Sequence, residues 1–137
     1  MGLNLRLAPG EKLVVNGSII RNNGRSRIDI EVENRSDVLR ASEMFDAESA
    51  DTPVKRACYM LQVALVSKLH RAESLARARA MLADLRDALG RTHGPVFDRA
   101  EELLDAEEFY GAERELRRML PFEAALLSYA PPEVRAA

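Results

Sequence analysis

The first third of the chain alternates between apolar and polar positions with a period of two, which is typical of half-buried β-strands. This alternation covers residues 3–7 and 28–32, and a short apolar segment lies between them at 18–21. The pattern predicts a β-meander over residues 3–33. Residues 38–40 are expected to form either a fifth strand or the start of a helical turn.

Two Asn-Gly pairs, Asn16-Gly17 and Asn23-Gly24, interrupt this region. Asn-Gly favours a type I′ hairpin turn, because both central residues of that turn need a positive φ. We therefore expect a hairpin at each pair. Short strands of this kind bury little by themselves, so they must pack on helices or on a second copy of the chain.

From residue 52 onward the apolar positions recur at helical spacing. Thr52 is a good N-cap and Pro53 suits the first helical position, so a helix is expected to begin there. No glycine or proline lies between residues 54 and 89, so residues 52–90 form either one long helix or two. The polar cluster at 67–71 is the expected break if there are two.

Glycine and proline divide the remainder. The glycine-containing segment 90–94 is expected to end the second helical stretch, and Pro95 to open a third helix. A fourth helix is expected from about Glu107 until Pro121, which should end or kink it. Residues 123–129 could add a last helical turn.

These patterns predict an α+β fold. A small N-terminal antiparallel β-sheet of about four to five strands is followed by a C-terminal bundle of about four α-helices. Residues 1–44 form the β-rich part, residues 45–130 the helical bundle and residues 131–137 a disordered tail, with one compact unit overall. A sheet this small leaves open edges that a second copy could pair, which favours a homo-oligomer.

Composition places the chain among ordinary globular proteins, with 47% apolar and 31% charged residues in 137. No apolar run reaches the roughly 18 residues needed to cross a bilayer, and the N-terminus lacks the pattern of a signal peptide. The single cysteine, Cys58, cannot form an intrachain disulfide. A cytoplasmic location is therefore expected.

Charge is distributed unevenly although the net charge is only −2. Residues 1–40 carry seven basic and five acidic side chains, whereas the remainder carries thirteen basic and seventeen acidic ones. Any nucleic-acid surface should therefore lie in the first third. The sequence contains no phosphate-binding glycine loop, HExxH, CxxC or nucleophile elbow. We predict no enzymatic activity, no cofactor and no metal site.

The chain resembles the flagellar biosynthesis repressor family FlbT over nearly its whole length. The family has an early pattern of alternating leucines, Pro-Gly-Glu and Asn-Gly, and a middle pattern of Thr-Pro, basic residues and an aromatic. Its late pattern is an aromatic pair, an alanine, an arginine, an apolar pair and an aromatic followed by Glu. These patterns are present as Leu5, Leu7, Pro9, Gly10, Glu11, Asn16, Gly17, Thr52, Pro53, Lys55, Arg56, Tyr59, Phe109, Tyr110, Ala112, Arg117, Met119, Leu120, Phe122 and Glu123. Two departures are Cys58, where the family often has an aromatic, and Pro121, which interrupts an expected helix.

This resemblance implies a post-transcriptional regulator of flagellin synthesis. Members of the family act on the 5′ untranslated leader of flagellin mRNA and limit its translation and lifetime. They work alongside the small helical protein FlaF. Some members act positively, so the sign of the regulation stays open, and so does the RNA motif.

The β-rich part is also similar, over a short pattern, to the RNA-binding regulator CsrA. That protein has an arginine on its first strand, then Gly-Glu, and a late Val-x-Arg-x-Glu-apolar pattern. In dimers of that family the first and last strands lie side by side and join their arginines into one RNA site. The corresponding positions here are Arg6, Gly10, Glu11, Val38, Leu39, Arg40, Glu43 and Met44, with one extra residue before the Glu.

Arg6 and Arg40 are the leading candidate RNA contacts, because a planar guanidinium can bond phosphate or base edges and stack on a base. The alternative is a pair of solvated strand arginines. The β region has no aromatic residue, so a base-stacking platform is not expected. The full candidate set for RNA binding is Arg6, Lys12, Arg21, Asn23, Arg25, Arg27 and Arg40.

Three of these arginines flank the Asn23-Gly24 turn and are expected to meet at one hairpin tip. Such a cluster would make a phosphate clamp, although arginines at a hairpin tip also serve solubility alone. In the helical part the candidate partner contacts are Tyr59, Phe109, Tyr110 and Phe122. They either pack the core or line a groove for a partner helix. The second functional hypothesis is therefore a chaperone-like adaptor that binds FlaF or flagellin and affects messages only indirectly.

Overall fold

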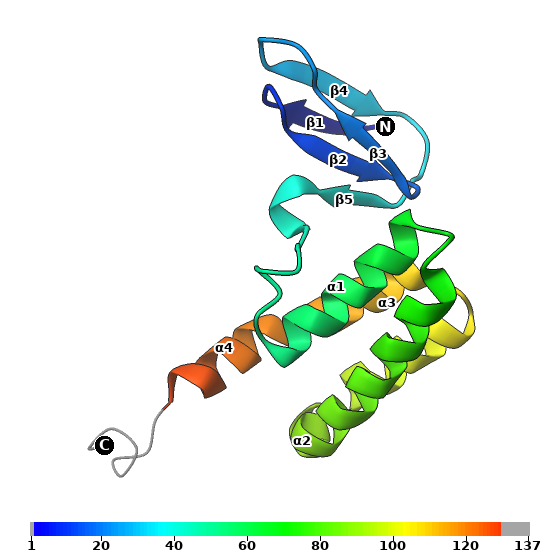
Figure 1. The fold of residues 1–137 in the computed structure, drawn as a ribbon, viewed down its shortest axis with the longest axis vertical. Helices are drawn as coiled ribbons and strands as arrows, with labels where there is room; N and C mark the ends of the chain where they lie inside the picture. Colours follow the sequence, from blue (N-terminus) through cyan, green and yellow to red (C-terminus); the bar gives the residue numbers. More distant parts are fainter. Residues whose placement is uncertain (1, 130–137) are drawn as a thin grey trace.

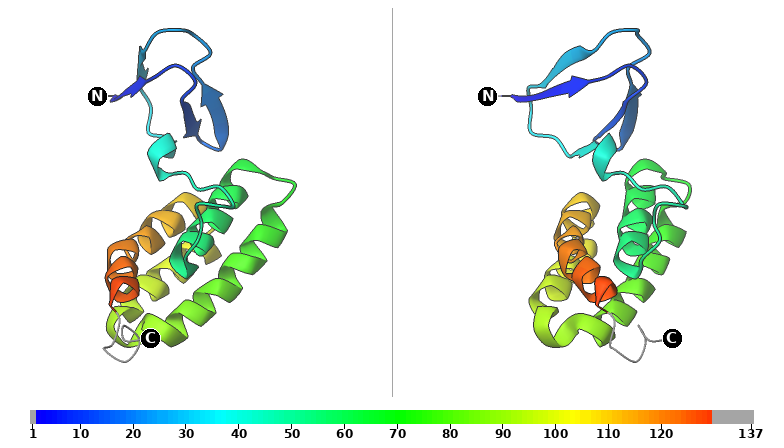
Figure 2. Two further views of the ribbon diagram at one scale, coloured as in Figure 1. Left: turned by 60° about the vertical axis from the view of Figure 1, so that its left-hand side comes forward. Right: turned by 90° about the vertical axis from the view of Figure 1, so that its left-hand side faces the viewer.

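The computed structural model describes residues 2–129. The predicted tail at 131–137 lies outside the described residues. Five strands form a β-rich part that stands beyond one end of a helical bundle, and Figures 1 and 2 show this arrangement from three sides. The predicted α+β class is confirmed. No helix among residues 2–129 is long and apolar enough to cross a membrane.

The strands form two small antiparallel sheets instead of the single sheet that was predicted. β1 (Leu3–Leu7) pairs with β4 (Ile28–Val32), whereas β2 (Lys12–Val15) lies between β3 (Ser18–Arg21) and β5 (Val38–Arg40). The expected meander over residues 3–33 is therefore wrong. Sequential strands do not all pair, because β3 and β4 belong to different sheets.

The two Asn-Gly pairs behave differently. Asn16 and Gly17 have φ values of 49° and 84°, so the predicted type I′ geometry is confirmed where β2 turns into β3. Position 17 also requires glycine for steric reasons, because a Cβ there would lie 2.7 Å from the backbone oxygen of Leu65. The hairpin tip thus rests against the end of the first long helix.

The second pair, Asn23-Gly24, does not form a hairpin, and neither residue has a positive φ. The buried side chain of Asn22 organises this loop instead. Its Nδ2 donates to the backbone oxygens of Leu7 (3.0 Å) and Ser26 (2.9 Å), and its Oδ1 accepts from the Gly24 N–H (2.9 Å). These bonds hold the loop in the path that carries the chain from one sheet to the other.

The interior between the two sheets is small. Its four buried residues lie on β1, β2 and β5, and three partly buried ones pack against them. They are Leu5, Leu7, Leu13 and Val38, with Val15, Ile30 and Val32 beside them.

The helical part begins as predicted. A short 3-10 turn, η1 (Ala41–Glu43), follows β5. α1 (Pro53–Val66) starts at the Thr52 N-cap, whose Oγ1 accepts from the Lys55 N–H at 3.3 Å. α1 ends before α2 (Arg71–Asp105) begins, so residues 52–90 form two helices with the break in the polar cluster.

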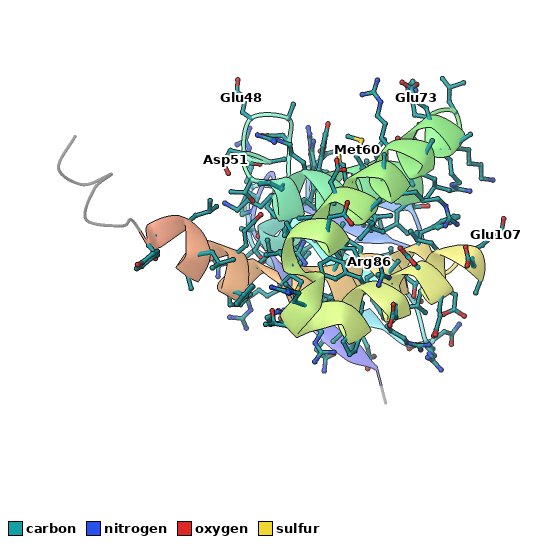
Figure 3. The ribbon with its side chains drawn as sticks, turned by 90° about the horizontal axis from the view of Figure 1, so that it is seen from below. Glu48, Asp51, Met60, Glu73, Arg86 and Glu107 are labelled. Atoms are coloured by element: carbon teal, nitrogen blue, oxygen red, sulfur yellow. The ribbon has the colours of Figure 1, made fainter. Side chains whose placement is uncertain are left out.

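α2 is one helix bent sharply on itself. His93 has non-helical dihedrals (φ −129°, ψ 26°) and marks the kink. In a straight helix Arg79 and Asp105 would lie about 39 Å apart, yet their side chains form an ion pair of 3.1 Å. Arg86 bridges the two arms in the same way, at 2.7 Å from Asp98 and 3.1 Å from Glu101 (Figure 3).

The kink corrects the expected number of helices. The predicted second and third helices are the two arms of the single helix α2. Three helices therefore stand where four were expected over residues 52–120. The third is α3 (Phe109–Arg117). Pro121 lies in the first turn of a further short helix, α4 (Leu120–Ser128), where the missing N–H needs no partner.

One large apolar core joins α1, both arms of α2 and α3. Its fourteen buried residues are Val54, Ala57, Cys58, Leu61, Ala78, Leu82, Leu85, Phe97, Ala100, Leu103, Leu104, Ala112, Leu116 and Met119. The helical core is therefore much larger than the interior between the sheets.

Candidate functional site

A hollow of about 160 Å³ opens on the β-rich part, and three of the candidate RNA contacts line it. Arg6 comes from β1, Lys12 from β2 and Arg40 from β5. The wall is completed by Leu5, Leu7, Glu11, Leu13, Ala41 and Ser42. Basic residues of three strands thus line one small concave surface, which we call the basic hollow.

The basic hollow forms where the two sheets meet. Arg40 lies opposite Leu13 in the β2–β5 ladder and shares its face, whereas Lys12, the residue before Leu13, points to the other face of this sheet. Arg6 belongs to the other sheet, in which it lies opposite Asp29. β1 and β5 do not pair within the chain, whereas the side-by-side strands implied by the CsrA likeness belong to a dimer. Arg6 and Arg40 nevertheless line the same hollow, from different sheets.

The charges of the basic hollow are only lightly compensated. Arg6 Nε lies 3.1 Å from Asp29 Oδ1, but these side chains are 66% and 80% exposed, so the pair contributes little energy. Glu11 turns its carboxylate toward the Ala8 N–H, which donates to Oε1 at 2.9 Å. Within the described residues, Lys12 and Arg40 form no ion pair. The surface is therefore accessible to an anion.

A second feature adds positive charge beside the basic hollow. Lys12 lies directly opposite Arg21 in the β2–β3 ladder, so the two side chains share a face of the sheet. Like charges in this position destabilise a sheet. A bound anion would relieve that repulsion, and Lys12, which also lines the basic hollow, connects this row to it.

The expected arginine cluster at one hairpin tip is not formed, because its hairpin is absent. Arg21 lies on β3, whereas Asn23, Arg25 and Arg27 are exposed in the loop before β4. Asn22 organises this loop, which the sequence pattern did not predict. The only local signal was an Asn next to an Asn-Gly pair, which does not distinguish a buried amide from a turn residue.

The aromatic candidates of the helical part are half-buried, and Tyr59 lies among them on α1. The guanidinium carbon of Arg71 lies 5.5 Å from the centre of the Phe109 ring. The ring of Phe122 lies 4.1 Å from that of His93, at the kink of α2. Phe109 and Phe122 also pack against the helical core.

Tyr110, the fourth aromatic candidate, joins the β-rich part to the bundle. Its hydroxyl donates to the backbone oxygen of Val38 on β5 at 2.8 Å and accepts from Arg114 Nε at 2.9 Å. Arg114 in turn forms an ion pair with Glu43 in η1. Tyr110 therefore bridges β5 and α3.

A buried polar network continues from this bridge. Glu113 is fully buried on α3, and its Oε1 accepts from Arg117 (2.7 Å) and from Gln62 (3.2 Å). Arg117 and Gln62 also donate to the backbone oxygen of Glu43, at 2.5 and 2.8 Å. The segment that leaves β5 is thus fixed to α1 and α3 by charge-assisted bonds.

Glu123 completes the contacts between distant segments. Its carboxylate accepts from the Val54 N–H at 2.8 Å and from the Thr52 hydroxyl at 2.5 Å. A negative charge at the N-terminus of α1 is favourable for the helix dipole. Thr52, Glu123, Tyr110 and Arg117, which all belong to the family-like patterns of the sequence, are thus engaged in contacts that hold the fold together.

No group of histidine, cysteine, aspartate or glutamate within residues 2–129 could hold a metal ion. Cys58 is buried. Burial, with the nearby charge of Glu113 as a smaller cause, raises the pKa of the Cys58 thiol far above its usual range. The thiol therefore stays neutral and unreactive in the folded protein.

Comparison with known proteins gives a consistent result. Residues 3–127 match the family described as "Flagellar protein FlbT". The chain is 38% identical over 56 residues to a "Probable flagellum biosynthesis repressor protein FlbT" from Caulobacter sp. (strain K31), covering 41% of this chain and 42% of that protein. It is 25% identical over 140 residues to the "Flagellum biosynthesis repressor protein FlbT" of Caulobacter vibrioides (strain ATCC 19089 / CIP 103742 / CB 15), covering 99% and 96% of the two chains. A relative from Chelativorans sp. (strain BNC1) is 26% identical over 129 residues, covering 90% and 85%. No solved structure matches the chain.

Proposed function

Because the chain belongs to the flagellar protein FlbT family, we propose that it regulates flagellum biosynthesis after transcription, by binding the 5′ untranslated leader of flagellin mRNA. Its relatives are named flagellum biosynthesis repressors. The observation that carries the RNA step is the basic hollow, which Arg6, Lys12 and Arg40 line from three strands.

The chemistry of the basic hollow suits a single-stranded leader. Two guanidinium groups and one ammonium group can bond successive phosphates, and arginine can also bond or stack on an unpaired base. The Lys12–Arg21 row extends the positive charge along one face of the sheet. A few contacts of this kind give a modest affinity that falls as the salt concentration rises. For single strands, the slope of log binding constant against log salt concentration is about −0.7 per phosphate contact.

A gel-shift titration on a flagellin leader and on a scrambled leader, each at two salt concentrations, tests the proposal. We expect the wild-type protein to prefer the natural leader. The double variant Arg6→Ala/Arg40→Ala should bind at least about a hundredfold more weakly, because each lost charged contact is worth about 1.5–3 kcal/mol. Its salt slope should fall by about 1.4.

Arg118→Ala is the matched control. Its guanidinium is 69% exposed and pairs with one carboxylate, much as Arg6 is 66% exposed and pairs with Asp29. Loss of binding in both variants would indicate a general charge effect. Equal weak binding of the wild type to both leaders would overturn direct leader recognition.

One observation favours a second candidate function, an adaptor that binds FlaF or flagellin. α4 exposes Leu126 and Leu127, at 47% and 62%, and Tyr129 follows at 67%. Exposed apolar residues grouped on a short helix are typical of a protein-binding surface. Calorimetric titration with purified FlaF and with flagellin tests this function, and Leu127→Asp should abolish any heat of binding that Arg6→Ala leaves intact.

A further inference from the structure

β3 is an open edge of the three-stranded sheet. All four of its residues are exposed, and Ile19 and Ile20 are 54% and 43% exposed. The direction of its main-chain groups follows from the ladder. The Asn22 N–H donates to the backbone oxygen of Glu11, on the side of β2. Since these groups alternate along an antiparallel strand, those of Ile19 and Arg21 face outward.

Two other edge strands, β5 and β4, are less suited to pairing with another chain. On β5, the backbone oxygen of Val38 already accepts from the Tyr110 hydroxyl. On β4, acidic residues alternate with apolar ones, so pairing two copies of β4 about Ile30 would place Asp29 opposite Glu31. Directly opposed like charges are destabilising. β3 carries one charge, at its end, and no such obstacle.

We propose that β3 pairs antiparallel with β3 of a second copy of this chain, centred on Ile20. A two-fold axis between identical antiparallel strands must place one residue opposite itself, because opposed side chains share a face. Centring on Ile20 places the outward groups of Ile19 opposite those of Arg21 of the partner subunit, and the reverse. Each of these two pairs exchanges two hydrogen bonds, so every outward main-chain group of Ile19 and Arg21 gains a partner.

The pairing gives a six-stranded sheet with two basic hollows. The two-fold axis is perpendicular to the sheet, so the Lys12–Arg21 rows of the two copies lie on the same face. One leader could then contact both copies, which raises the apparent affinity without new contacts. This consequence rests on the proposed function, whereas the pairing itself does not. The edge is short, so the dimer should be reversible and concentration-dependent.

Cysteine cross-linking tests both the pairing and its register. In the proposed register Ile20 faces itself in a non-hydrogen-bonded pair, with Cα atoms about 4.5 Å apart, within the range for a disulfide. Ile20→Cys should therefore give a disulfide-linked dimer as the major species after mild oxidation. Ile19→Cys is the matched control and should stay largely monomeric, because the two Ile19 positions are offset along the strands. The buried Cys58 should give no cross-link in the wild type.

Sedimentation over a range of concentrations provides an independent test. The wild type should shift from monomer to dimer as concentration rises, and Ile20→Lys should remain monomeric. Ile28→Lys, on β4 and at a similarly exposed position (40%), should dimerise like the wild type. A wild type that stays monomeric at all concentrations, or cross-linking of Ile19→Cys as fast as Ile20→Cys, would overturn the proposal. No RNA is present in either assay, so failure here is distinct from failure of leader binding.

Discussion

The β-rich part and the helical bundle of this protein are stabilised in different ways. Fourteen buried residues form one continuous core in the bundle, whereas four form the interior between the two sheets. The β-rich part compensates with specific main-chain geometry, such as the Asn16-Gly17 turn and the amide bonds of Asn22. Every candidate RNA contact lies in this less deeply packed part. We infer that the bundle supplies most of the stability of the fold, while the β-rich part presents an exposed, charged surface.

Several contacts between the two parts are polar. Tyr110 and Arg114 hold β5 and η1, while Arg117 and Gln62 hold the backbone of Glu43. Polar contacts of this kind depend on direction more than on area. These directional bonds help to fix the orientation of the β-rich part, and single substitutions can test how much each bond contributes.

The largest effect is expected in the helical core. Phe97→Ala should lower the free energy of unfolding by about 3–5 kcal/mol, because Phe97 is fully buried and its removal leaves a cavity. Leu5→Ala, between the sheets, should cost about 2 kcal/mol, the low end for a buried leucine. Urea denaturation followed by circular dichroism measures both values.

Leu69→Ala serves as the control for this pair. Leu69 is 87% exposed, so its truncation should change the free energy of unfolding by less than about 0.5 kcal/mol. A larger loss from Leu5→Ala than from Phe97→Ala would contradict the contrast between the two interiors.

A smaller effect is expected where α4 meets α1. Glu123→Ala removes the acceptor for the Val54 N–H and the Thr52 hydroxyl, so a buried donor loses its partner. The expected cost is about 1–3 kcal/mol in the same denaturation experiment. Glu123→Gln keeps one acceptor oxygen and should cost less. Glu48→Ala, at an exposed position, should have no measurable effect; a comparable loss there would mean that net charge, and not the cap, explains the result.

Local signals in the sequence predicted those elements whose cause is local. Thr52 sets the start of α1 as its N-cap, and Pro53 does so through the φ angle that its ring imposes. Asn16-Gly17 sets a turn through the positive φ angles of its two residues. Asn23-Gly24 carries the same signal but fails, because the side chain of Asn22 bonds to Leu7, fifteen residues away. A hydrogen bond between residues so far apart in the sequence cannot be predicted from the local pattern of residues.

The same limit applies to the candidate site. Arg6 and Arg40 were singled out by a resemblance, but their place beside the same hollow depends on β1 pairing with β4 and β5 with β2. The alternation of apolar and polar residues predicts which face of a strand is buried, but it does not predict which strand lies beside it. The buried contacts of Glu113 and Gln62 were missed for a related reason, since helical periodicity assigns polar residues to the solvent side by default.

The smallest effect, and the one that bears most directly on the junction, is expected for Tyr110→Phe. The substitution removes only the hydroxyl that donates to the backbone oxygen of Val38 and accepts from Arg114. Its cost should be about 1 kcal/mol, and it should be local. Hydrogen exchange of the amides of β2 and β5 should become about fivefold faster, while that of α2 stays unchanged. Tyr59→Phe is the matched control, because Tyr59 is also half-buried and its hydroxyl has no hydrogen-bond partner within residues 2–129. Equal exchange in the two variants would show that the β-rich part does not depend on this bond for its attachment to the bundle.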